Sequence, residues 1–319
     1  MTERIKDLSV EAKAGYKVPF GTVSITDDAR ELIDKALDTK FVTRGKYVAE
    51  FERKFADLFG TSEAVAVSSG TDADALALAV LYDYGADRGD EVIIPALTFV
   101  ATGNAVFQAG FKPVFVDVKR ETLNIDVDKI EAVITKKTRA IMPVHLMGKP
   151  AGMDRIMAIA KKYHLYVVED AAEAHGAEYH GKKIGTFGHM AAFSLYAAHI
   201  ITTIEGGMVI TGDPAMAEAL RSLRNHGLVN KFEFLRIGFS AKMNEIEAAV
   251  GLVNIKIFSE ILGRRRRNLL YLIDKFQAFE RFFITIKEEK NEKIGPHAFS
   301  VILRPGLKFT KDEFVEYLD

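Results

Sequence analysis

The sequence predicts an α/β protein with three layers: a mixed, mostly parallel sheet with helices on both faces. Short runs of β-branched and aliphatic residues alternate with longer amphipathic segments along most of the 319 residues, a pattern typical of parallel strands joined by crossover helices. Hydrophobic residues make up 48% of the chain, enough for a large core at this length. Near residue 250 the alternation gives way to one long helix. We therefore expect a large α/β domain over residues 1–250 and a smaller α+β domain over residues 251–319.

Composition and charge argue against several classes of protein. The net charge of −1 offers no basic surface for a nucleic acid or an acidic membrane. The chain has no apolar run long enough to cross a bilayer, and residues 1–7 lack the apolar core of a signal peptide. The absence of cysteine excludes disulfides, cysteine nucleophiles and a cysteine-held iron–sulfur cluster. We expect a cytoplasmic protein.

The first elements after a leader are two amphipathic helices. Residues 25–37 and 47–59 carry apolar side chains at helical spacing, and Gly60 is a typical helix end. Residues 41–46 between them form either a plain connector or a loop near a substrate.

The first strand leads into a candidate site for an anion. Residues 64–67 are a short buried strand, followed by Ser69-Gly70-Thr71 and a buried helix from about Ala75. A strand–glycine–helix junction offers free backbone amides and the positive end of a helix dipole to an anion. Gly70 and Thr71 are the candidate ligands, although such a sequence is more often an ordinary helix cap.

Two later strands end at residues suited to chemistry. The strand at residues 91–94 ends at Pro95 and is followed by Phe99, an aromatic ring that either stacks on a planar ligand or fills the core. The strand at residues 165–170 closes with Asp170, which in isolation would most often cap a helix.

The next strand is followed by the polar turn around which the other motifs are arranged. Residues 193–199 run from the strand through Ser194 to His199, and Gly206-Gly207 opens the following strand. Both side chains should lie at the rim of the sheet, where ligands bind in open α/β sheets.

The last part of the chain is a long helix and a short α+β segment. The helix from about residue 244 to 276 carries Arg264 to Arg267, which we interpret as a solvated or interface face. Residues 299–303 form a strand, and a final helix from Thr310 ends after about two turns without a capping residue. We expect the small domain to be incomplete.

Five of these motifs occur in an order that resembles the DegT/DnrJ/EryC1/StrS family of sugar aminotransferases, which are fold type I enzymes dependent on pyridoxal phosphate. They are the Ser-Gly-Thr turn, Pro-x-x-Thr-Phe, Glu-Asp-x-x-x-x-His-Gly, Ser-x-x-x-x-His and Gly-Gly. The resemblance covers most of the chain and implies pyridoxal 5′-phosphate or pyridoxamine 5′-phosphate as the cofactor. It also implies a homodimer with shared active sites.

The resemblance assigns a role to each candidate residue. Asp170 would hold the ring nitrogen protonated, so that the ring acts as an electron sink. Glu173 would lie near a substituent of the ring, and Phe99 would stack on one face. The phosphate would be bound by Gly70, Thr71 and Ser194. Ser240, where the family usually has Asn, would reach the phosphate site of a neighbouring subunit.

His199 stands where the family usually has a lysine that bonds covalently to the cofactor. An imidazole cannot make that bond but can move protons near neutral pH. A histidine at this position resembles the sugar 3-dehydratases of the family, whose best-known member acts on GDP-4-keto-6-deoxymannose. The implied reaction removes the C3 hydroxyl of a nucleotide-linked 4-keto-6-deoxy sugar in deoxysugar biosynthesis. His199 would be the acid and base, and glutamate would restore pyridoxamine phosphate. A related branch that uses an iron–sulfur cluster is disfavoured because the chain has no cysteine.

Two alternatives remain open. Loss of the lysine could have left an inactive pseudo-aminotransferase that only binds a sugar nucleotide. A conventional aminotransferase would need another lysine, such as Lys182 or Lys183. The other histidines show no metal-ligand spacing, so we expect no metal site. The sequence does not specify the nucleotide or the hexose.

Overall fold

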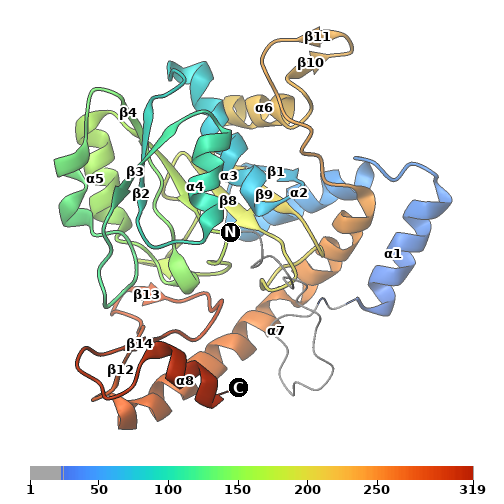
Figure 1. Cartoon of the computed structure of the whole chain (residues 1–319). Coiled ribbons are helices and arrows are strands. Elements are labelled where there is room, and N and C mark those ends of the chain that lie inside the picture. Colours follow the sequence, from blue (N-terminus) through green and yellow to red (C-terminus); the bar gives the residue numbers. More distant parts are fainter. Residues whose placement is uncertain (1–22, 24, 319) are drawn as a thin grey trace, which may run out of the picture.

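The computed structural model describes residue 23 and residues 25–318, and it has a central sheet between two layers of helices (Figure 1). Most of the predicted leader lies outside the described residues. The sheet has the order β1-β9-β8-β5-β4-β2-β3. All its strands run in one direction except β9, which is antiparallel to β1 and β8. The prediction of a three-layer, mixed, mostly parallel sheet is therefore confirmed. The strands are β1 (Glu63–Val67), β2 (Glu91–Pro95), β3 (Lys112–Val116), β4 (Thr138–Ile141), β5 (Tyr166–Asp170), β8 (Met190–Ser194) and β9 (Gly207–Thr211).

The strands bury both faces because alternate side chains point to opposite sides. Ala64 and Ala66 of β1 belong to one core cluster, while Val65 and Val67 belong to the other. The first cluster is covered by α2 (Lys46–Phe59), α5 (Met153–Tyr163) and α7 (Glu245–Phe276). The second is covered by α3 (Gly70–Ala79), α4 (Val100–Gln108) and α6 (Pro214–Leu223).

The long helix α7 leaves the sheet and carries a smaller unit at its far end (Figure 1). In this unit β12 (Phe283–Thr285) pairs with β14 (Val301–Leu303), and α8 (Lys311–Leu318) follows. Its core is separate and includes Leu269, Ile273, Ile286 and Ile294. One strand, β13 (Glu292–Lys293), pairs instead with β6 (Glu178–Tyr179), which also pairs with β7 (Lys182–Lys183). We propose that the domains divide near residue 250, inside α7.

Two further elements lie at the edges of the molecule. Helix α1 (Asp27–Asp38) is capped by Thr26, whose hydroxyl accepts a hydrogen bond from Ala29 N. The hairpin β10 (Leu228–Asn230) and β11 (Glu233–Phe234) projects beyond the sheet (Figure 1). Within the described residues, no helix is both long enough and apolar enough to cross a membrane.

Glu245 joins the start of α7 to the start of α2. Its buried carboxylate accepts hydrogen bonds of 2.9–3.0 Å from the backbone N–H groups of Gly45, Tyr47 and Val48. The first N–H groups of a helix have no partner within the helix. Glu245 therefore supplies the cap that α2 lacks in its own sequence.

Replacing Glu245 with alanine should lower the free energy of unfolding by roughly 3 kcal/mol, because buried N–H groups lose their acceptor. Urea denaturation would measure the loss. Glu50→Ala is the control, since it removes only an ion pair with Lys54 in which both side chains are partly exposed, and it should change stability by less than about 0.5 kcal/mol. A loss in Glu245→Ala no larger than in the control would show that these N–H groups find other acceptors.

Candidate active site

The predicted site residues lie along the edge of the sheet where the parallel strands end. Asp170 is the last residue of β5 and Ser194 the last residue of β8, and these two strands are neighbours. Helix α3 begins three residues after β1 and α4 begins five residues after β2. This is the edge at which open α/β sheets bind ligands.

Gly70 and Ser194 are in direct contact. The structure therefore places two of the three residues predicted to bind the phosphate next to each other. A Cβ atom on Gly70 would lie 2.6 Å from Ser194 Cβ and 3.0 Å from its hydroxyl oxygen. Helix α3 begins at Gly70, not near Ala75 as predicted, because Ser69 caps it by accepting from Asp72 N at 3.0 Å. Gly70 and Thr71 therefore belong to its first turn. Their backbone amides are free of the helix ladder and available to an anion.

Gly70→Ala should weaken the binding of the cofactor at least about tenfold, because the new methyl group would displace Ser194 from the cradle. An absorbance titration with pyridoxal phosphate would measure the affinity. Gly212→Ala is the matched control, since a Cβ there has no atom within 4 Å. Equal affinities in the two variants would exclude Gly70 from the phosphate site.

Asp170 is buried and held by a short chain of hydroxyl groups. It is 5% exposed. One carboxylate oxygen accepts from the Thr102 hydroxyl at 2.7 Å, and that hydroxyl lies 2.7 Å from the hydroxyl of Thr98. The other accepts from Ala172 N at 3.2 Å, which is the local capping contact that an isolated aspartate would make. Burial raises the pKa of Asp170 above its ordinary value.

A second buried aspartate, Asp74, lies in α3 and was not singled out from the sequence. It is 2% exposed, and its Oδ1 has no hydrogen-bond partner among the described residues. Burial, and then the nearby charge of Asp170, raise the pKa of Asp74 well above its ordinary value. Asp74 is a charged residue within a mostly apolar helix. That contrast is the only signal in the sequence that could have pointed to it.

Glu173 and Phe99 flank this site in different surroundings. Glu173 is half-buried and accepts from Met147 N at 2.6 Å, and burial raises the pKa of its carboxyl group. Phe99 precedes the first residue of α4 and is 70% exposed. The core-filling interpretation of Phe99 is therefore wrong for this chain, and stacking remains a prediction.

Two other imidazole rings lie close to the ring of His199. Its ring centroid is 5.6 Å from that of His175, with the planes at 16°, and 4.9 Å from that of His297. Burial, together with His175, His297 and the guanidinium of Arg265, lowers the pKa of His199 to about 2. The ring is therefore neutral at physiological pH.

The arginine run in α7 is only partly a solvated face. Arg264 and Arg267 are exposed as expected, but Arg265 and Arg266 turn inward. Arg266 bonds Glu288 at 2.5 Å and the carbonyl of Ile294 at 2.7 Å, and Arg265 reaches the carbonyl of Ala198 at 3.0 Å. Arg264 and Arg267 are three residues apart and so lie on the same face of the helix, whereas Arg265 and Arg266 lie on another face. This spacing is the sequence signal that could have distinguished the exposed arginines from the inward ones.

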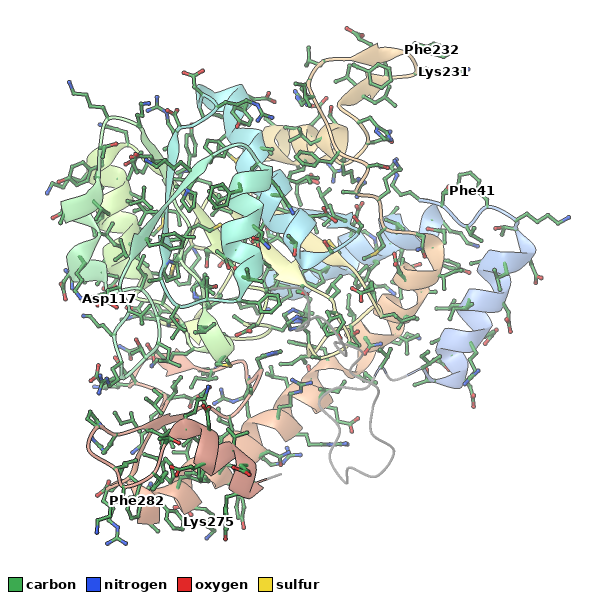
Figure 2. The ribbon with its side chains drawn as sticks, in the orientation of Figure 1. Phe41, Asp117, Lys231, Phe232, Lys275 and Phe282 are labelled. Carbon is green, nitrogen blue, oxygen red and sulfur yellow. The ribbon has the colours of Figure 1, made fainter. Side chains whose placement is uncertain are left out.

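Ser240 does not join the other candidates in the single chain. It is exposed, follows the hairpin β10–β11 and accepts from Lys242 Nζ at 3.5 Å. Figure 2 shows Lys231 and Phe232 at the tip of this hairpin, away from the body of the molecule, and Phe232 is 83% exposed. The predicted role of Ser240 requires a second chain.

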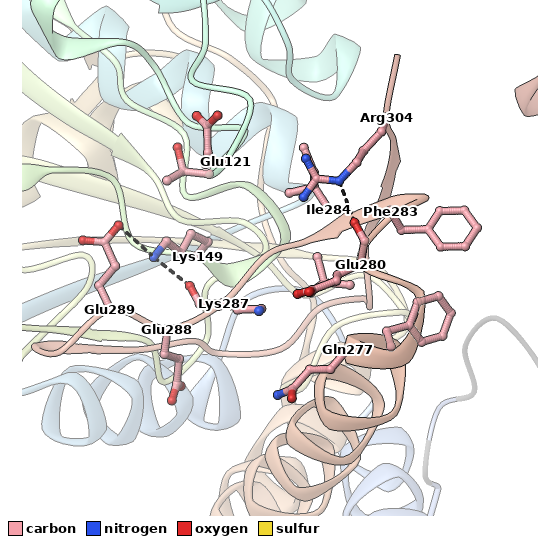
Figure 3. Close-up of a pocket in the computed structure, with 13 residues that line it drawn as sticks. Glu121, Lys149, Gln277, Glu280, Phe283, Ile284, Lys287, Glu288, Glu289 and Arg304 are labelled. Carbon is pink, nitrogen blue, oxygen red and sulfur yellow. Dashed lines mark hydrogen bonds and ion pairs between the residues drawn. The ribbon is translucent and has the colours of Figure 1, made fainter. Parts of the chain in front are cut away.

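A hollow of about 290 Å³ lies elsewhere, at the junction of the two domains (Figure 3). None of the predicted site residues lines it. Lys149 on its wall is 1% exposed, and its ammonium pairs with Glu292 and donates to the carbonyl of Lys287 at 3.0 Å. One wall of the hollow is therefore a contact between the two domains in which the charge of Lys149 is paired. No group of acidic, histidine or cysteine side chains within residues 25–318 could hold a metal ion.

Comparison with known proteins identifies relatives of the whole fold. A profile of the DegT/DnrJ/EryC1/StrS aminotransferase family matches residues 23–319. GDP-perosamine synthase of Caulobacter vibrioides is 40% identical over 309 residues, 95% of this chain and 82% of that protein. GDP-4-keto-6-deoxy-D-mannose 3-dehydratase of Yersinia pseudotuberculosis is 33% identical over 325 residues, 94% and 82% of the two chains. The E. coli GDP-4-keto-6-deoxy-D-mannose-3-dehydratase, solved with bound hydrated pyridoxal phosphate, has a TM-score of 0.88 at 31% identity, covering 94% of this chain and 82% of that one.

The fold and the relatives together define a fold type I enzyme dependent on pyridoxal phosphate. The chain belongs to the DegT/DnrJ/EryC1/StrS aminotransferase family. This membership confirms the predicted fold class and the predicted cofactor, pyridoxal 5′-phosphate with its amine form. The residues at the sheet edge fit that group, because Gly70 carries no side chain where a Cβ would meet Ser194, so the first amides of α3 and the Ser194 hydroxyl lie together.

Proposed function

We propose that the enzyme is a 3-dehydratase that removes the C3 oxygen from a nucleotide-linked 4-keto-6-deoxyhexose. The observation that carries this proposal is His199, an imidazole at the position where the family pattern has a lysine, in a site that keeps the ring neutral. A neutral imidazole transfers protons and makes no stable covalent bond to an aldehyde.

The proposed site divides the work among a few side chains. Gly70, Thr71 and Ser194 hold the phosphate, Phe99 covers one face of the ring, and Asp170 pairs with the ring nitrogen. Glu173 lies near a ring substituent. When bound in this way, the cofactor supplies an electron sink for the carbon that loses a proton. Asp170 gains a cationic partner there, which offsets the cost of burying its charge.

His199 is the proposed acid and base. A ring nitrogen of the neutral imidazole takes up a proton, and the imidazolium that results lies beside Arg265, His175 and His297. Because burial and these neighbours disfavour the charged ring, it should give the proton up readily to the departing C3 hydroxyl group. The same environment makes His199 a poor reservoir for protons from the solvent.

The lysines named as alternatives have partners of their own. Lys183 donates to the carbonyl of Leu58, and the ammonium of Lys182 lies 4.6 Å from the ring centroid of Phe187. Both lie on β7, the outer strand of a separate small sheet with the order β13-β6-β7. Neither contact supports a role in holding the cofactor.

A conventional aminotransferase is the second candidate, favoured by the 40% identity to a GDP-perosamine synthase against 33% to the dehydratase. Overall identity averages over the chain, whereas the choice between the two reactions depends on one side chain at the cofactor. We therefore give more weight to His199. An inactive sugar-nucleotide binder is the third candidate, and the presence of Asp170, Ser194 and Gly70 argues against decay of the site.

We further propose that the sugar is linked to GDP, as in the names of both relatives, that glutamate restores the amine form, and that two chains form a homodimer with shared active sites. A dimer would cover the exposed apolar side chains near the site and on the hairpin, and it would bring Ser240 to a neighbouring phosphate cradle. These exposed residues are Phe99, Val100, Phe232, Phe234, Leu235 and Ile237.

Mass spectrometry of the sugar products tests the proposed reaction. The protein would be incubated with pyridoxal phosphate, glutamate and GDP-4-keto-6-deoxymannose, and then with a panel of other nucleotide-linked 4-keto-6-deoxy sugars. The proposal expects a product lighter by one oxygen atom that keeps its ketone. An amino sugar would mean transamination instead, and cofactor binding without turnover of any sugar would favour the inactive binder.

A further inference from the structure

One of the three imidazoles in the cluster around His199 comes from the small domain. His297 follows β13, lies 4.9 Å from His199 between ring centroids, and has a plane tilted by 34° from it. His175, whose ring centroid is 5.6 Å from that of His199, comes from the loop after β5. The side chain of His297 is only 13% exposed.

The backbone that carries His297 is fixed to the large domain. Gly295 N donates to the carbonyl of Gly148 at 3.1 Å, and His297 N donates to the carbonyl of Met147 at 3.4 Å. Gly148 has a φ of +82°, and a Cβ on it would lie 1.8 Å from the carbonyl oxygen of Gly295. The two segments therefore approach as closely as backbones can, which leaves His297 little freedom to move.

Arg265 of α7 ties the backbone at His199 to the backbone at His297. Its Nη2 donates to the carbonyls of Ala198 and His199 at 3.0 and 3.3 Å. Its Nη1 donates to the carbonyls of Pro296 and His297 at 3.3 and 3.4 Å. One planar guanidinium thus fixes the spacing between the two histidines, a task suited to its rigid fork of donors.

Two ring nitrogens beside His199 lack ordinary partners. His297 Nδ1 and His175 Nε2 are buried and have no hydrogen-bond partner among the described residues. The other nitrogen of His297 lies 3.8 Å from a carboxylate oxygen of Glu173. Unpaired buried polar atoms cost stability and call for an explanation in function.

From these contacts we infer that His297 is a positioning residue for His199: the small domain places its imidazole against the His199 ring, with its Nε2 3.8 Å from a carboxylate oxygen of Glu173. The inference rests on the proposed catalytic role of His199. It gives the small domain a part in proton transfer, because a displacement of the domain would move the base away from the reacting atoms. An error of this kind in the position of a catalytic group is worth about 100-fold in rate.

Two variants test the inference in the full chain. His297→Ala removes the ring and should lower kcat for the deoxygenation about 30- to 100-fold, with KM for the sugar within about twofold. His297→Phe restores an aromatic ring beside His199 and should recover most of the lost kcat. His180→Asn is the control, because His180 is exposed, lies outside the cluster of three imidazoles and has a φ of 51°, which asparagine tolerates. It should leave kcat unchanged.

A spectroscopic readout separates this inference from the proposed reaction. In protein with ¹⁵N-labelled histidine, the ring signals of His199, assigned by their loss in His199→Asn, should not titrate between about pH 5 and pH 8. The groups that face this ring are His175, His297 and Arg265. His297→Ala admits water to one side, so the pKa of His199 should rise toward its ordinary value and the signals should begin to titrate.

Three results would overturn the inference: a kcat in His297→Ala within about threefold of the wild type, unchanged His199 signals in that variant, or a folded His297→Phe that recovers no activity. If His297→Ala does not fold, the signals and kcat of His297→Phe decide, since a positioning ring predicts values near those of the wild type. If the wild-type enzyme makes an amino sugar or no product, the proposed function fails, but the ring signals still report whether His297 controls the surroundings of His199.

Discussion

Replacing His199 with asparagine should lower the turnover of the keto sugar by at least about 1,000-fold while the protein stays folded and still binds pyridoxal phosphate. Asparagine cannot accept and release a proton near neutral pH, and general acid–base catalysis by one side chain is worth about 100- to 10,000-fold. The phosphate cradle at Gly70 and Ser194 does not depend on the imidazole. Product formation by mass spectrometry and an absorbance titration with the cofactor would measure the two effects separately.

His199→Lys is the informative companion to this variant. The guanidinium of Arg265 and the burial that lower the pKa of His199 would also keep part of a lysine side chain neutral. That amine should bond covalently to pyridoxal phosphate, and borohydride would preserve the bond as an added mass on the peptide containing residue 199. Near-normal turnover in His199→Asn would remove His199 from the chemistry and reopen the search for another base.

The elements of the fold could be predicted because their signals are local. Each strand of the sheet is a short β-branched or apolar run between turn residues, and α7 begins where Asn244 and Glu247 form a capping box. The start of α3 was placed too late because the hydroxyl of Ser69 draws Gly70 and Thr71 into the first turn. The reversed direction of β9 leaves no mark in its pattern of side chains, since alternation is the same in both directions.

Only those residues of the candidate site that lie at strand ends could be predicted from the sequence. Asp170 and Ser194 end neighbouring strands, and therefore their proximity follows from the sheet. Arg265 and His297 come from the long helix and the small domain, and their place beside His199 depends on how the domains pack. Without that packing an arginine run is most often solvated and a lone histidine most often structural, so neither residue carries a signal of its own.

Asp170→Asn should make the protein without cofactor more stable and at the same time weaken its use of the cofactor. Burial raises the pKa of Asp170 above its ordinary value of 3.8. The carboxyl group therefore favours the folded state only at low pH, and that contribution is lost as pH rises through the raised value. At pH 7 the empty variant should be more stable than the wild type by roughly 1 kcal/mol, a typical gain where a functional group is costly to bury. The difference should disappear near pH 3.8 and below.

The same variant should lose at least about tenfold in cofactor affinity and about 100- to 1,000-fold in turnover, because asparagine cannot hold the ring nitrogen in its charged form. Asp213→Asn is the matched control. Asp213 caps α6, asparagine caps a helix equally well, and this variant should match the wild type in both measurements. Thermal unfolding with and without pyridoxal phosphate, followed across this pH range, would test the argument. If Asp170→Asn without cofactor is less stable than the wild type at pH 7, the hydrogen bonds from Thr102 and Ala172 outweigh the cost of burying the charge. The site would then stabilise the charged carboxylate of Asp170 even when no cofactor is bound.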